Sequence, residues 1–97
     1  MSNVSLTYLK TAWTHNFRDE PVEIWCELTF DRIEVRVVEI FADGRIGFAS
    51  RASSSGSTRL SESPIPSVDE IAMDPQFKPV VVTCSEFEAT WSKANSG

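Results

Sequence analysis

The sequence predicts an α+β fold, in which an antiparallel sheet of four to five strands carries two short helices packed on one side or end. Apolar and polar residues alternate through residues 22–30, which is typical of a strand with one buried face. A β-hairpin signal stands at Asp43-Gly44, and helix-capping patterns follow in the second half of the chain. Residues 1–97 are expected to form a single domain with a core from about residue 6 to 93.

The strands are predicted from the period of two and from the turns between them. They cover residues 6–13, 22–30, 33–41 and 45–50, and residues 78–83 add a fifth strand or an extended segment. The apolar positions change sides within residues 33–41. A β-bulge near Val37-Val38, or a helix that covers the far end of this strand, would explain the change. A type I′ turn is expected at Asp43-Gly44, because both central residues of that turn need positive φ.

A serine-rich loop and a short helix follow the fourth strand. Residues 50–63 are half serine with Gly56 in the middle, which indicates a flexible surface loop. Ser67 and Glu70 then have the spacing of a capping box, so a helix should begin there. Asp74-Pro75 ends this helix after little more than one turn.

A C-terminal helix is predicted from a second capping pattern at Ser85-Glu86-Phe87-Glu88. Phe87 and Trp91 are four residues apart and share one face of this helix. Trp25 is a large aromatic residue on the polar face of its strand, between two glutamates, and is not expected to be left uncovered. Either the face with Phe87 and Trp91 packs on Trp25, or Trp25 anchors a partner.

Composition and charge limit the classes of function. The formal net charge of −5 opposes binding to nucleic acid, where basic surface supplies most of the affinity, and favours a basic partner. No signal peptide or membrane-spanning run is visible, so a cytoplasmic location without membrane contact is expected. Cys26 and Cys84 lack the close spacing of a metal site or redox pair and are interpreted as two buried free thiols.

No catalytic residue, metal site or cofactor is expected. His15 is the only histidine and lies in a turn, with no nucleophile that the sequence places beside it, so it is interpreted as a surface residue. The carboxylates lack the spaced oxygen ligands of a calcium-binding loop. They alternate around Trp25, which indicates either a solvated sheet face or a binding patch.

The residues proposed for binding are aromatic, acidic and basic: Trp13, Glu20, Glu23, Trp25, Glu27, Glu34 and Arg59. The four glutamates would steer a basic partner toward the domain, and a tryptophan would hold it. Arg59 would form an ion pair with carboxylates of the sheet.

Several motifs resemble those of a known family. They are Tyr8-Leu9-Lys10-x-x-Trp13, Glu20-Pro21-Val22-x-Ile24, Glu34-Val35-Arg36-x-Val38-Glu39-x-Phe41-x-Asp43-Gly44-Arg45-x-Gly47, Thr58-Arg59-Leu60, Pro64-x-Pro66, Ile71-x-x-Asp74-Pro75-x-Phe77 and Phe87-x-x-x-Trp91. With them the chain resembles a family of short bacterial cytosolic proteins of unknown function. The resemblance implies a bacterial, stand-alone domain and no activity, cofactor or site residue. The serine-rich loop, Cys26 and Cys84 depart from the family pattern.

Two functions follow as hypotheses. The first is a protein-binding module, such as an immunity or inhibitor protein against a basic toxin, by analogy of size and charge alone. The alternative is a sensor or sequestering protein for a small molecule or nucleotide, with a pocket between the sheet and residues 50–63. Arg45, Arg51 or Arg59 would hold an anionic ligand there. An enzyme is not expected, and an open sheet edge would allow a homodimer.

Overall fold

The computed structural model describes residues 6–96 and contains five strands and two helices. The elements are β1 (Thr7–Trp13), β2 (Glu23–Leu28), β3 (Glu34–Ile40), β4 (Ile46–Ser50), α1 (Val68–Ala72), β5 (Phe77–Val82) and α2 (Cys84–Asn95). All neighbouring strands are antiparallel, in the order β4-β3-β2-β1-β5. The predicted α+β class is confirmed. Within these residues no helix is long and apolar enough to cross a membrane.

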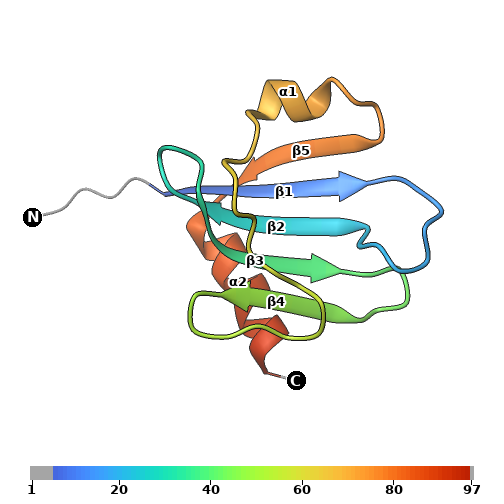
Figure 1. Cartoon of the computed structure of the whole chain (residues 1–97), viewed down its shortest axis with the longest axis vertical. Helices are drawn as coiled ribbons and strands as arrows, with labels where there is room; N and C mark the ends of the chain where they lie inside the picture. Colours follow the sequence, from blue (N-terminus) through green and yellow to red (C-terminus); the bar gives the residue numbers. More distant parts are fainter. Residues whose placement is uncertain (1–5, 97) are drawn as a thin grey trace, which may run out of the picture.

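The connection between β4 and β5 determines how the two faces of the sheet are covered. β4 and β5 lie at opposite edges, so the chain between them must cross the sheet. In Figure 1 this segment passes in front of the strands to reach α1, whereas α2 lies behind them. Residues 58–66 of the crossing segment are called the strap below. The front face is thus covered by the strap and the back face by α2.

Each face has its own apolar core. On the front face, Cys26, Leu28, Val37 and Ala49 form a buried cluster against which Leu60 and Ile65 of the strap pack. On the back face, the ring of fully buried Phe87 of α2 lies tilted against that of Tyr8, while Trp91 contacts Phe48 edge to face. Burial of one large apolar side chain contributes about 1.5–3 kcal/mol, so both layers support the sheet.

Arg36 holds α2 against the back of the sheet. Its guanidinium donates to Glu27 on β2 at 2.6 and 2.9 Å, and to Glu88 on α2 at 2.6 Å. It also lies 4.9 Å from the ring centre of Phe87 and 5.0 Å from that of Trp91. The hydrogen bonds to Glu27 first, and then to Glu88, raise the pKa of Arg36. One side chain therefore joins two strands and the helix by charge and by stacking.

The predicted bulge near Val37-Val38 is wrong, and the irregularity lies earlier in β3. Glu34 and Arg36 pair with the consecutive residues Leu28 and Glu27, so Val35 is the extra residue. Val37 and Val38 are both buried because the strap covers one face and α2 the other. Adjacent apolar residues in a strand covered on both faces need no bulge.

The hairpin between β3 and β4 also differs from the expected type I′ turn. Gly44 has a φ of 93°, whereas Asp43 does not have positive φ. Gly44 N–H donates to Phe41 O at 3.0 Å, and Phe41 N–H donates to Arg45 O at 2.9 Å. The loop has three residues, and glycine is still required at its last position.

The helix starts follow from their capping residues. At α1 the predicted capping box of Ser67 and Glu70 is present. At α2 the cap is Thr83, two residues earlier than predicted, and its partner is Glu86. The predicted partner Glu88 binds Arg36 instead, so it does not take part in the cap.

The serine-rich segment is attached to β4. Ala49 and Ser54 form an isolated β-bridge, and Ser55 N–H donates to Phe48 O at 2.9 Å.

Both cysteines are free thiols. Cys26 is buried as predicted, but Cys84 is exposed because it opens the first turn of α2.

We predict that Arg36→Met lowers the free energy of unfolding by about 3 kcal/mol, because Glu27 would stay buried without its cation. Urea denaturation followed by circular dichroism measures the change. Arg45→Met is the control: its ion pair with Asp43 is exposed, so its loss should stay within about 0.5 kcal/mol. Equal small losses in the two variants would contradict the role given to Arg36.

Candidate functional site

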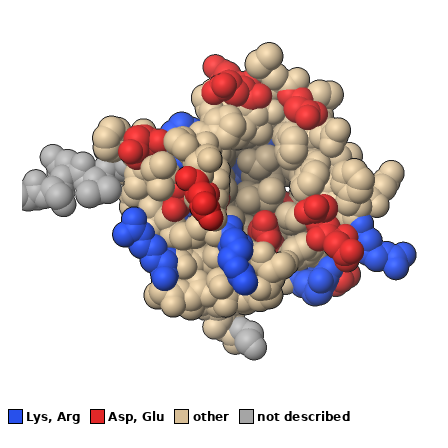
Figure 2. Space-filling view, in the orientation of Figure 1, with Lys and Arg blue, Asp and Glu red and all other residues tan. Residues whose placement is uncertain are grey.

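A cavity of about 580 Å³ opens on the front face, between the sheet, the strap and α1. Figure 2 shows this face hollowed at its centre, with acidic and basic side chains around the hollow. The lining residues are Leu9, Thr11, Ile24, Cys26, Glu34, Val37, Glu39, Arg59, Ser61, Ile65, Pro66, Glu70, Ile71, Asp74 and Phe77. The volume lies within the range of small-molecule sites, roughly 300–1,000 Å³.

The floor and much of the wall are apolar. Alternation along each strand turns Leu9 of β1, Ile24 of β2 and Val37 of β3 toward the front. Ile71 of α1 and Phe77 of β5 line the side where α1 packs beside the sheet edge. The cavity can therefore take up the apolar part of a ligand.

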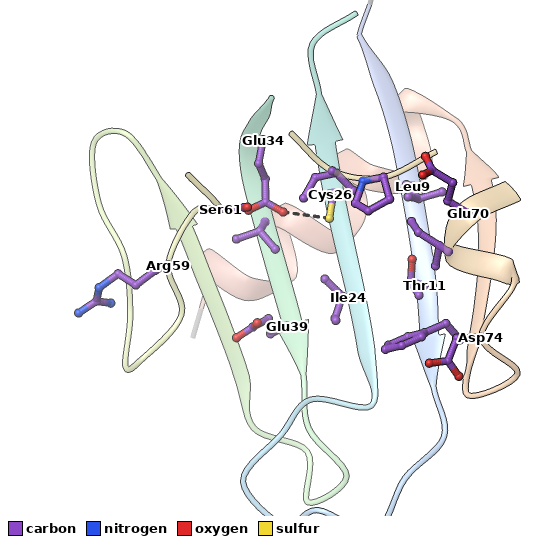
Figure 3. A pocket seen from close by; sticks show the side chains of 15 residues that line it. Leu9, Thr11, Ile24, Cys26, Glu34, Glu39, Arg59, Ser61, Glu70 and Asp74 are labelled. Carbon is purple, nitrogen blue, oxygen red and sulfur yellow. Dashed lines mark hydrogen bonds between the residues drawn. The ribbon is translucent and has the colours of Figure 1, made fainter. Parts of the chain in front are cut away.

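Four carboxylates line the same cavity from two sides. In Figure 3, Glu34 and Glu39 project from β3, while Glu70 and Asp74 lie across the floor on α1 and the turn after it. Among residues 6–96, none of the four forms an ion pair with a lysine, arginine or histidine. The lining is therefore acidic, with four carboxylates and one arginine, and no ion pair among residues 6–96 neutralises these carboxylates directly. The capping contacts with Ser67, and then the nearby charge of Arg32, lower the pKa of Glu70.

Glu34 reaches the cavity because of the bulge at Val35. The extra residue places Glu34 opposite Leu28, on the front face; regular pairing would turn it to the back. Only 8% of Glu34 is exposed, and both carboxylate oxygens are used. The Cys26 thiol donates to one at 3.1 Å, and Ser61 N–H of the strap donates to the other at 2.7 Å. Glu34 thus fixes the strap to the sheet.

Glu39 holds the start of the strap. Thr58 Oγ1, on a buried residue, donates to Glu39 Oε1 at 2.8 Å. A side chain at Gly47 of β4 would collide with Thr58, so glycine makes room for this contact. Burial raises the pKa of Glu39, with smaller increases from Glu34 and Glu20, while the hydrogen bond from Thr58 lowers it. A cation bound beside Glu39 would reverse this shift.

Cys26 is unsuited to nucleophilic chemistry. Burial first, and then the neighbouring charge of Glu34, raise the pKa of its thiol well above the ordinary value. The thiol form is also the one that donates to Glu34. Reactive cysteines show the opposite, a lowered pKa in electropositive surroundings.

Arg59 brings no free positive charge into the cavity. Its Nη1 donates to Ser54 Oγ at 3.3 Å and to the carbonyl oxygens of Gly56 and Thr58 at 3.0 and 2.8 Å. Figure 3 shows its guanidinium pointing away from the floor. The carboxylate pairing predicted for Arg59 does not form; Arg45 pairs with Asp43, and Arg51 is exposed outside the lining. The cavity expected between the sheet and residues 50–63 is present, with a volume of about 280 Å³ and Arg45 in its lining, and it is separate from the larger acidic cavity under the strap.

The other residues predicted for binding do not share one surface. Glu27 is buried on the back face with Arg36 and the Tyr8 hydroxyl. Glu23 accepts from Trp25 Nε1 at 2.6 Å and lies 3.8 Å from Lys10 Nζ.

The two tryptophans predicted to bind a partner, Trp25 and Trp13, pack against side chains of the domain itself. Lys10 Nζ lies over the half-buried ring of Trp25, 5.4 Å from its centre. The aromatic side chains of α2 contact Tyr8 and Phe48 rather than Trp25. Trp13 stacks on Phe77, and Glu20 is exposed.

His15 lies in the connection between β1 and β2 and is partly buried, although a surface position was expected. Its Nδ1 accepts from Phe17 N–H at 2.8 Å, and Nε2 lies 2.8 Å from Pro21 O, so Nε2 carries the donated proton. Among residues 6–96, no three His, Cys, Asp or Glu side chains are placed to hold a metal ion together.

Three of the four cavity carboxylates were missed by the sequence analysis: Glu39, Glu70 and Asp74. Glu39 alternates with Val37, which would have placed it on the front face of β3. In the sequence, Glu70 and Asp74 indicate only where the short helix begins and ends. Their approach to β3 depends on where the strap crosses, and no local pattern encodes that.

A comparison with protein families gives one match. The model described as "Domain of unknown function (DUF6881)" matches residues 7–96, which span every strand and both helices. No curated protein and no solved structure matches the chain. The match includes all of the cavity, and the description assigns no activity to it.

We predict that Glu39→Gln stabilises the protein at neutral pH by up to about 1 kcal/mol, a small value because Glu39 is only partly buried. A carboxyl whose pKa is raised on folding costs stability once the pH exceeds that pKa, and glutamine keeps the hydrogen bond from Thr58. The gain should disappear as the pH falls through the raised pKa toward the ordinary range of glutamate. Urea denaturation across pH measures it, with exposed Glu62→Gln as control. If Glu39→Gln were less stable than the unchanged protein at neutral pH, the raised pKa of Glu39 would be contradicted.

Proposed function

We propose that this chain, which belongs to the DUF6881 family of domains of unknown function, binds a small organic cation with an apolar body in the front cavity. In this proposal the domain is a binding protein rather than an enzyme. The exposed thiol of Cys84 supports a reducing, cytoplasmic setting.

The observation that carries the proposal is that the cavity is lined by several carboxylates but by no cationic side chain that pairs with them. Four carboxylates line it, and the one arginine of the lining donates to the serine-rich segment instead. The burial that raises the pKa of Glu39 is a cost that the fold does not offset with a cation of its own. An ammonium or guanidinium group of a ligand would supply the missing charge.

Affinity for a minimal ligand should be modest. Burial of about 100 Å² of aliphatic surface contributes on the order of 2.5 kcal/mol. A partly exposed ion pair adds about 1 kcal/mol or less. These contributions total about 3.5 kcal/mol before the cost of association, so a Kd of several millimolar or weaker is expected for a short alkylamine.

Binding of a basic protein is the second candidate, and an aromatic ridge beside the cavity supports it. Phe17 is 62% exposed and lies 5.3 Å from His15 and 6.2 Å from Trp13, between ring centres. Trp13 in turn stacks on Phe77 of the cavity wall at 5.4 Å. Such a ridge suits a partner that inserts a lysine or arginine side chain into the cavity.

The immunity-protein version of this candidate must use the cavity and the ridge. Its sequence-based form needed Glu20, Glu23, Glu27 and Glu34 on one face. The fold places Glu27 on the back with Arg36 and Glu34 on the front under the strap. Exposed Val80 and Val81 on the edge strand β5 support a proposed strand-to-strand contact between two copies.

We predict that hexylamine binds more tightly than hexanol, and that hexanoate does not bind. The three compounds share one chain length and differ in charge, so the order isolates the negative potential of the cavity. Amide chemical-shift changes in ¹H–¹⁵N spectra, centred on Cys26, Glu39 and Ile71, measure affinity and location. Binding should weaken as the pH falls through the raised pKa of Glu39, because protonation removes the charge beside the ligand.

The matched variants are Glu39→Gln and Glu62→Gln. Glu39→Gln should lower the affinity for hexylamine roughly two- to fivefold. Glu62→Gln, at an exposed position of the strap, should leave this affinity unchanged. Equal binding of hexylamine and hexanoate would refute the proposal.

A further inference from the structure

Building on the proposed function, we infer that the cavity takes a linear dication, with two ammonium groups joined by an aliphatic spacer. The structural basis is the division of the carboxylates into two groups on opposite sides of an apolar floor. A ligand with one cationic group would satisfy only one side.

The two groups belong to elements that are far apart in the sheet. Glu34 and Glu39 lie on β3, whereas Glu70 and Asp74 lie on α1 and the turn that leads into β5. β3 is three strands away from β5 in the strand order, about 14 Å at the usual spacing of neighbouring strands. A ligand that contacts both groups would have to span a distance of this order with an extended aliphatic chain.

Each side has acceptors left for a ligand. Glu39 Oε1 accepts from Thr58, Glu70 Oε1 from Ser67 N–H, and Asp74 Oδ1 from Gln76 N–H. Within residues 6–96 the second oxygen of each of these carboxylates has no hydrogen-bond partner. Both oxygens of Glu34 are occupied, so Glu34 contributes charge while Glu39 contributes the contact.

The two ends of the site differ in exposure. Glu39 is half-buried below the strap, whereas Glu70 and Asp74 are exposed at the opposite rim. An ion pair at Glu39 is therefore shielded from solvent, while one at the rim is weak and screened by salt. Between them, Leu9, Ile24 and Phe77 present the apolar surface over which the spacer would lie.

The test compares straight-chain diamines, from diaminobutane to diaminodecane, with the monoamine of each length by isothermal titration calorimetry at low salt and near neutral pH. The best diamine should bind roughly two- to fivefold more tightly than its monoamine, and the advantage should peak at an intermediate length and decrease at high salt.

The variants assign each end of the ligand. Glu70→Gln keeps the capping box and, combined with Asp74→Asn, should bring the diamine down to the affinity of the monoamine while leaving the monoamine unchanged. Glu39→Gln should weaken both compounds. Asp69→Asn, on α1 outside the lining, is the matched control and should change neither.

The outcomes separate this inference from the proposed function. Equal affinity of diamine and monoamine at every length, with binding still weakened in Glu39→Gln, would overturn the dication and leave the cation site standing. A diamine advantage that survives the Glu70 and Asp74 changes would also overturn it, because the second ammonium would lie elsewhere. If no amine binds, both proposals fail.

Discussion

The constraint on which the rest of the structure depends is the position of β4 and β5 at opposite edges of the sheet. A chain that completes a four-stranded meander at one edge and adds its fifth strand at the other has to cross one face. The crossing segment of this chain is extended and narrow, so it covers the core around Cys26, Leu28 and Val37 and leaves the area toward β1 and α1 open. The cavity is thus a consequence of the topology, and its polar walls are the side chains that hold the strap in place.

The two faces of the sheet treat buried carboxylates in different ways. On the back, buried Glu27 lies with the Tyr8 hydroxyl and forms an ion pair with Arg36, which also binds the exposed Glu88. On the front, Glu34 and Glu39 receive a thiol, a backbone N–H and a hydroxyl, all uncharged donors. Uncharged donors satisfy hydrogen bonds without cancelling charge. The same strands therefore have a neutral, structural face and a face whose potential is available to a ligand.

The fold was largely predictable from the sequence because its strands have a period of two and its first helix has a local capping box. The prediction failed where a long-range contact decides the local outcome. Of the two explanations given for the apolar pair Val37-Val38, the bulge is wrong, and cover by a helix agrees with the back face, where α2 packs on β3. The strap that covers the front face is a distant segment that a strand pattern does not reveal. Glu88 looked like a capping residue because its contact with Arg36 lies 52 residues away. The cavity could not be predicted from the sequence for the same reason, because its carboxylates come from positions as far apart as residues 34 and 74.

Acidic side chains whose negative charge is not needed to hold the strap make the cavity the strongest candidate site. The raised pKa of Glu39 means that burial opposes its charged form, and a fold selected for stability alone would place an uncharged group there. The strap needs only hydrogen-bond acceptors at these positions, which asparagine or glutamine would also supply. The use of acids instead leaves negative charge facing an apolar floor. A local departure from the most stable choice, at a concave surface of ligand size, is the pattern expected where a protein gives up stability for binding.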